Sequence, residues 1–154
     1  MQKKCDLYFC DSVNSSRLKF LELFDKNFLY DSKKSYSGFL HTNVDRVKLV
    51  SVVSDLKRHG IICFSAPIEY RDRETISMEA AFDFATKHAN AYGASVAISM
   101  RHQKIPPVFW IFDQLPGGNS EEKSGGVVMI DRLDGHVWTD SEYEEYLYDY
   151  NNVL

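Results

Sequence analysis

The sequence contains few cysteines and no long apolar run. Its three cysteines, Cys5, Cys10 and Cys63, are an odd number without a close CxxC pair, so neither a disulfide framework nor a zinc site is predicted. No apolar stretch reaches the roughly 18 residues that a membrane span needs. The N-terminus, MQKKCDLYFCDS, has no continuous apolar segment behind its basic start. These absences predict a protein of the reducing cytoplasm without a membrane partner.

The sequence also lacks the short motifs of common enzyme classes. It has no GxSxG, P-loop, HExxH or glycine-rich dinucleotide pattern, and its five histidines are scattered. Cys63 lies in an apolar stretch, which predicts a buried and unreactive thiol. We therefore predict no catalytic residue and no cofactor. The alternative is a small cytosolic enzyme, hydrolase-like, whose site is assembled from residues distant in sequence.

What the sequence does contain is typical of an ordinary globular protein. It has 154 residues, of which 44% are hydrophobic and 26% are charged. This length is enough for one domain with a real core, and no linker or repeat divides it. A single domain over residues 1–154 is the expectation.

Helices are predicted where apolar spacing coincides with capping and stop signals. Asn43 can cap one helix that ends at Gly60, and Ser77 can cap another that ends at Gly93. With the apolar pattern that follows Asn14, the predicted helices are 14–30, 43–60 and 77–93. Val44, Val47, Val50, Val53 and Leu56 form the predicted apolar stripe of the second.

Strand character appears in short runs that are separated by turn residues. These runs are 5–10, 61–70, 94–100, 106–113, 125–131 and 136–139, whereas 31–42 and 114–126 are predicted loops. Together with the helices they predict an α+β fold, in which helices pack on one face of a mainly antiparallel β-sheet. A short C-terminal helix completes it.

Negative charge is concentrated near the C-terminus. From Asp113 onward there are ten acidic residues and two basic ones, a net charge of −8 in a chain whose total is −4. Such a field repels nucleic acid and attracts basic partners, so no direct nucleic-acid binding is predicted. The alternative is a solvated acidic face that only keeps the protein soluble.

The segment GGVVMIDRLDGHVWTDSEYEEYLYDY predicts a hairpin that leads into an acidic helix. Gly135 supplies the positive φ of a tight turn after Asp134. Thr139 with Glu142, or Ser141 with Glu144, can form a capping box. Helical spacing places four apolar or aromatic residues in one stripe for docking on the sheet: Tyr143, Tyr146, Leu147 and Tyr150.

Oxygen and imidazole ligands for a divalent cation also lie in this segment. Asp131, Asp134, His136 and Asp140 are the candidates. Turn chemistry accounts for Asp134 and helix capping for Asp140, so we predict no metal site.

The pattern IDRLDGHVW, with glycines before it and an acidic, tyrosine-containing segment after it, resembles the C-terminal hairpin of immunity proteins from bacterial polymorphic toxin and contact-dependent growth inhibition systems. The resemblance covers residues 125–150. Arg132 and Leu133 stand where those families more usually have a lysine and a hydroxyl residue. The resemblance implies a cytoplasmic protein that binds and neutralises a cognate protein toxin and has no catalysis of its own.

Charge and resemblance together predict the face that contacts the partner. A basic toxin domain, such as a nuclease, would be covered by acids with exposed tyrosines as anchors. The predicted partner-binding residues are Asp134, Asp140, Glu142, Tyr143, Glu144, Glu145, Tyr148 and Asp149.

Overall fold

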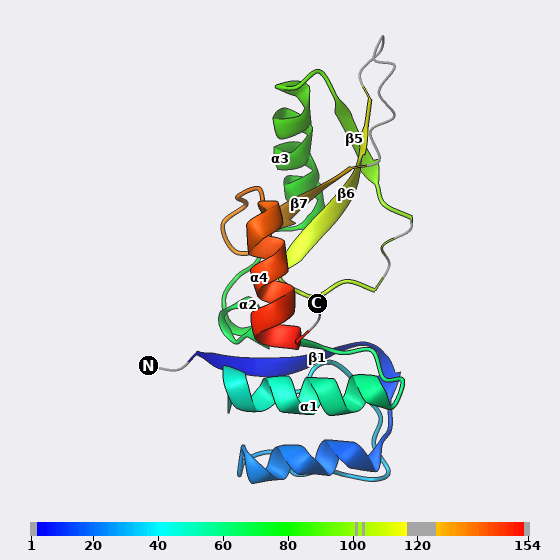
Figure 1. Cartoon of the computed structure of the whole chain (residues 1–154), viewed down its shortest axis with the longest axis vertical. Helices are drawn as coiled ribbons and strands as arrows, with labels where there is room; N and C mark the ends of the chain where they lie inside the picture. Colours follow the sequence, from blue (N-terminus) through cyan, green and yellow to red (C-terminus); the bar gives the residue numbers. More distant parts are fainter. Residues whose placement is uncertain (1–2, 101, 103, 117–125, 153–154) are drawn as a thin grey trace. The chain divides into compact units, whose positions relative to one another are not determined.

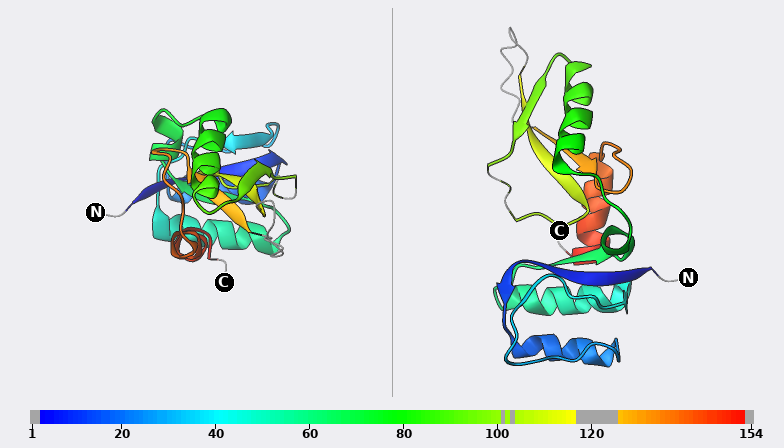
Figure 2. Two further views of the ribbon diagram at one scale, coloured as in Figure 1. Left: turned by 90° about the horizontal axis from the view of Figure 1, so that it is seen from above. Right: turned by 180° about the vertical axis from the view of Figure 1, so that it is seen from behind.

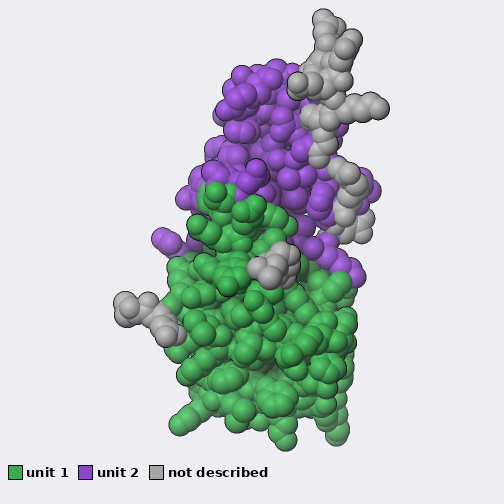
Figure 3. Space-filling view, viewed as in Figure 1, with its two compact units in different colours: residues 1–72, 141–154 green, residues 73–140 purple. Residues whose placement is uncertain are grey.

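The computed structural model describes residues 3–100, 102, 104–116 and 126–152. The chain divides into two compact units, unit 1 with residues 1–72 and 141–154 and unit 2 with residues 73–140 (Figure 3). Each unit combines helical structure with its own antiparallel sheet, so the predicted α+β class is confirmed. That residues 1–154 form one domain stays a prediction. No helix within the described ranges is long and apolar enough to cross a membrane.

The sheet of unit 1 is built around its first strand, β1 (Lys4–Val13). β1 pairs antiparallel with β2 (Tyr36–Phe39), β3 (Val44–Asp45) and β4 (Phe64–Pro67). Cys5 lies opposite both Val44 and Pro67, and Tyr8 lies opposite both Phe39 and Phe64. β2 and β3 therefore share one edge of β1, and β4 occupies the other.

Two sequence predictions for unit 1 are wrong. The predicted loop 31–42 contains β2, and the predicted helix 14–30 is a shorter 3-10 helix, η1 (Ser16–Leu23). In η1 the buried residues are Leu18 and Leu21, three positions apart, which suits a helix of three residues per turn.

The predicted helix 43–60 corresponds to α1 (Arg46–Arg58), which Gly60 ends with a φ of 77°. Its buried stripe differs from the predicted one, because Val47 is 57% exposed. α1 lies beside the sheet, with η1 on the far side of α1 (Figures 1 and 2). The residues that α1 buries are Leu49, Val52, Val53 and Leu56. A one-turn helix, α2 (Glu69–Asp72), follows β4.

Unit 2 is a three-stranded sheet covered by one helix. Its strands, in the order β5 (Ser95–Ile98), β6 (Phe109–Leu115) and β7 (Val127–Asp131), pair antiparallel. The helix α3 (Met78–Asn90) packs on all three strands and buries Ala81, Ala85 and Ala89. Ser77 caps α3 as predicted, because its side chain accepts a hydrogen bond from the Ala80 amide at 3.1 Å.

The predicted turn after β7 is confirmed, since Gly135 has a φ of 78°. The predicted strand 136–139 is reduced to a single bridge between Ile130 and Val137. The predicted short C-terminal helix is confirmed as α4 (Asp140–Asn151), and Thr139 is the residue that precedes it. Most of the predicted loop 114–126 lies outside the described residues.

Burial explains the chemistry of two of the three cysteines. Cys5 and Cys63 are fully buried in the core of unit 1. Burial disfavours the thiolate, and it raises the pKa of Cys5 to about 11 and that of Cys63 to about 12. Cys63 is therefore a buried, protonated thiol, as the apolar sequence around it predicted.

Candidate functional site

The predicted partner-binding residues fall mainly on α4, which is fixed to the outer edge of β4. The hydroxyl of Tyr146 donates a hydrogen bond to the Ser65 carbonyl at 2.6 Å, and the Ser65 amide donates to Asn151 Oδ1 at 2.9 Å. Two side chains of one helix thus satisfy both backbone groups that Ser65 directs away from β1. The edge of β4 is covered by a helix, which prevents it from pairing with another strand.

Burial and charge strengthen this attachment. Tyr146 is 5% exposed, and burial raises the pKa of its hydroxyl, which stays protonated and able to donate. Tyr150 packs against the core of unit 1, and the Arg46 guanidinium lies 5.6 Å from its ring centroid. Arg46 also donates to the Asp149 carbonyl, and Lys57 donates to the Asn151 carbonyl at 3.4 Å. Both bases therefore meet the C-terminal end of α4, where the helix dipole is negative.

The predicted docking stripe is right in part. Tyr146 is buried, whereas Tyr143, Leu147 and Tyr150 are only half-buried. Asn151 is fully buried and carries one of the two edge hydrogen bonds, although it is not among the residues predicted from the sequence. Asn151 is a polar residue one position past the aromatic stripe, and no local pattern predicts its hydrogen bond to Ser65, 86 residues away.

The opposite side of α4 is acidic and exposed. We call the acidic face the set Glu144, Glu145, Tyr148 and Asp149, which recur at helical spacing, and all four are exposed. Tyr148 is 56% exposed, a large apolar ring among carboxylates. Within the described part of the chain, none of these three carboxylates forms an ion pair. Their charged groups therefore remain open to solvent.

The remaining predicted residues do not belong to this face. Glu142 and Tyr143, at the start of α4, are half-buried. Asp134 and Asp140 are exposed residues of unit 2. The structure thus brings together four of the eight predicted residues on one helix surface.

Three of the four candidate metal ligands do come together in the turn of unit 2. Ligand atoms of Asp131, Asp134 and His136 lie within 4.8 Å of one another. Asp131 is 3% exposed, and its carboxylate accepts from the Leu133 amide and from Trp138 Nε1, both at 2.8 Å. Asp134 accepts from the His136 amide at 3.0 Å, and this hydrogen bond is the main cause of the lowered pKa of Asp134. Turn formation therefore accounts for the position of each group.

A buried polar network in unit 1 was not foreseen from the sequence. Asp6 has no exposed surface, and its carboxylate accepts from the amides of Leu7, His41 and Thr42, from the Thr42 hydroxyl, and from Arg71 Nη1 at 3.3 Å. Arg71 also donates to the Thr42 carbonyl at 2.8 Å. The network holds His41 at a φ of 66°. Five donors occupy the oxygens of the Asp6 carboxylate, which therefore stabilises the backbone at His41 and Thr42. Its lone pairs are used in these hydrogen bonds and not in catalysis.

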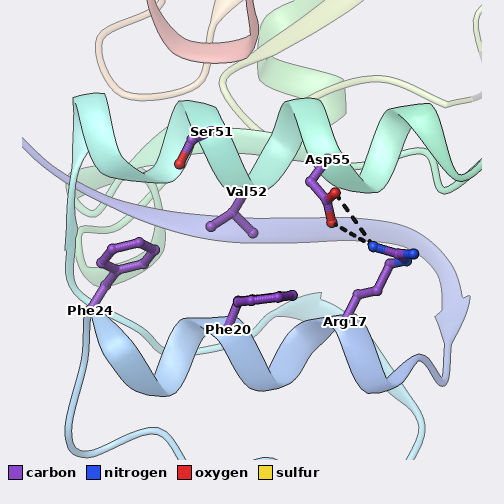
Figure 4. Close-up of a pocket in the computed structure, with 6 residues that line it drawn as sticks. All are labelled: Arg17, Phe20, Phe24, Ser51, Val52 and Asp55. Carbon is purple, nitrogen blue, oxygen red and sulfur yellow. Dashed lines mark hydrogen bonds and ion pairs between the residues drawn. The ribbon is translucent and has the colours of Figure 1, made fainter.

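A hollow of about 230 Å³ lies between η1 and α1 (Figure 4). Phe20, Phe24 and Val52 point into it, and Arg17 pairs with Asp55 at 3.3 Å. Ser51 lines it as well, but the Ser51 hydroxyl donates to the Lys48 carbonyl at 2.6 Å. The hollow is therefore an apolar recess rather than a set of reactive groups.

Comparison of the chain with protein-family models, with curated proteins and with solved structures found no match.

Proposed function

We propose that this protein is a cytoplasmic immunity protein, which binds a cognate bacterial toxin domain through the acidic face of α4 and so covers a basic site on it. The observation that carries the proposal is this face: three unpaired carboxylates around the exposed ring of Tyr148. The resemblance of IDRLDGHVW to the hairpin of immunity proteins supports the same conclusion.

Rigidity of the face supports binding to a folded partner. The hydrogen bonds of Tyr146 and Asn151 to Ser65 fix α4 on the sheet of unit 1 before any partner arrives. A surface that is already ordered loses little conformational entropy on association, which favours tight binding.

Charge and the aromatic ring have separate roles in this proposal. Carboxylates of the acidic face raise the rate of encounter with a basic surface, because their field acts over about a Debye length, ~10 Å at 0.1 M salt. Tyr148 then provides area that loses its water in the complex, which slows dissociation. A nuclease domain suits this arrangement, since its site must attract phosphate and is therefore basic.

Co-expression with the toxic C-terminal domain encoded by a neighbouring toxin gene tests the proposal. We expect the chain to restore growth and to co-purify with the toxin domain. The double charge reversal Glu144→Lys with Glu145→Lys should slow association and weaken its salt dependence. Tyr148→Ala should raise the dissociation rate, with a loss of binding free energy of about 1 to 3 kcal/mol.

The matched control is Glu79→Lys with Asp83→Lys on α3, which changes the net charge by the same amount. If reversal on α4 leaves the association rate and its salt dependence unchanged, the acidic face is only a solvated surface. If both double variants slow association equally, the total charge of the protein sets the rate and the position of the acids on α4 does not.

A further inference from the structure

The strand β5 is the outer strand of the unit 2 sheet. Residues Ser95–Ile98 pair with β6 on one side, and no other strand in the described ranges pairs with them on the second side. Alternate residues of an antiparallel strand direct their N–H and C=O groups to each side, so half of the β5 backbone groups point outward. An open row of this kind is a template for an added strand.

A groove of about 570 Å³ runs between this strand and α3. Phe82, Val96 and Phe112 line its inner part, and the last two are nearly buried. Met78 and Ile98 line it as well, and they are 37% and 57% exposed. Its volume is in the range of ligand pockets, and its lining offers apolar contacts for side chains of a bound segment.

Two carboxylates line the groove from the α3 side. Glu79 and Asp83 are four residues apart on the helix, so both lie on the surface that faces the groove. Both are exposed, and neither forms an ion pair among the described residues. An occupant with basic side chains would complement this negative wall.

We propose that this groove binds an extended segment of a partner polypeptide, which adds to β5 as a further strand. Alternate side chains of a strand point to opposite faces. Apolar side chains of the segment therefore enter the groove beside Phe82 and Ile98, and a lysine or arginine reaches Glu79 and Asp83. Backbone hydrogen bonds to β5 provide affinity, while the groove and its carboxylates select the sequence. This function is separate from the toxin binding proposed for α4.

Selection from a library of random decapeptides on the immobilised whole chain tests the proposal. We expect enriched peptides to alternate apolar residues with others and to carry lysine or arginine. Their binding should shift the amide NMR signals of β5 and of the first turns of α3. Absence of enriched peptides, or shifts confined to unit 1, would overturn it.

Variants of the groove sharpen the test with one enriched peptide. Glu79→Lys with Asp83→Lys should weaken its binding by at least about tenfold, and Ile98→Ser by about tenfold. The matched control, Glu144→Lys with Glu145→Lys on α4, should leave the affinity within about twofold, because these acids lie outside the groove. Equal loss in both double variants would reveal unspecific charge attraction and would contradict the proposal.

A second copy of this chain could occupy the groove instead of a partner segment. Light scattering on the free protein at high concentration distinguishes the two cases. If the wild type is a dimer that Ile98→Ser converts to a monomer, self-association explains the groove and the peptide proposal is wrong.

Discussion

The outer strands of the two units differ in what covers them. In unit 1, β4 has its free edge closed by Tyr146 and Asn151 of α4, which take both outward backbone groups of Ser65. In unit 2, β5 has no such cover within the described residues and lies beside an apolar groove with unpaired carboxylates. One edge thus fixes a helix, whereas the other has no strand or helix hydrogen-bonded to it among the described residues.

The largest effect should come from the residue that closes the β4 edge. Tyr146→Ala removes a buried ring and leaves the Ser65 carbonyl without its donor, so the free energy of unfolding should fall by about 3–5 kcal/mol in urea titration. Tyr146→Phe keeps the ring and should cost about 1 kcal/mol.

Tyr148→Ala on the same helix is the control, and its effect should stay within about 0.5 kcal/mol, since this ring is exposed. Similar losses for Tyr146→Ala and Tyr148→Ala would mean that α4 is not held on β4 as described.

A smaller effect is expected at the turn of unit 2. Gly135→Ala places a residue with a side chain in the left-handed region of φ, which costs about 1–2 kcal/mol of stability. The new Cβ would also lie 2.9 Å from the Phe84 ring and 3.0 Å from Ile76. Gly93→Ala, at a φ of 71° with nothing within 4 Å, is the matched control for the backbone cost alone.

Differential scanning calorimetry of both variants measures the difference. Gly135→Ala should destabilise unit 2 more than Gly93→Ala does. Identical losses would show that the packing of Phe84 and Ile76 against the turn contributes nothing.

The smallest effect concerns alkaline pH and unit 1, which holds all three cysteines. Burial raises the pKa of Cys5 to about 11 and that of Cys63 to about 12, whereas an ordinary thiol titrates near 9. Below pH 9 both thiols are protonated in the folded and unfolded chain, and their contribution to stability is fully present. Above pH 9 only the unfolded chain releases these protons, so stability should decline as pH rises toward 11 and 12.

Unfolding in urea at several values of pH between 8 and 10 checks this expectation. Cys63→Val, which keeps an apolar side chain in the core, should flatten the decline. A slope that is unchanged in this variant would assign the decline to other groups.

Local signals in the sequence were sufficient for some elements. Ser77 and Gly93 bound α3 as predicted, and Gly135 marks the turn after β7, because capping and positive φ are properties of single residues. The helix 43–60 was also found, but its start moved to Arg46, since the preceding residues pair with β1 as β3. Element types were thus more predictable than their ends.

Long-range pairing is what the sequence could not provide. The polar segment around Tyr36 becomes a strand only because β1 lies beside it, and periodicity does not say which strands pair. The acidic face was predictable from helical spacing, but its attachment was not. Asn151 and Ser65 are 86 residues apart, and no local pattern around either residue predicts their hydrogen bond.

Amide hydrogen exchange in the free protein tests most directly whether α4 is locked on the β4 edge. The Ser65 amide should be strongly protected, because it donates to Asn151 Oδ1 at 2.9 Å, and Asn151→Ala should reduce its protection at least about tenfold. The β5 amides that point away from β6 should exchange rapidly in both proteins. If the Ser65 amide exchanges as fast as those β5 amides in the wild type, the β4 edge is open and α4 is not a fixed platform for binding.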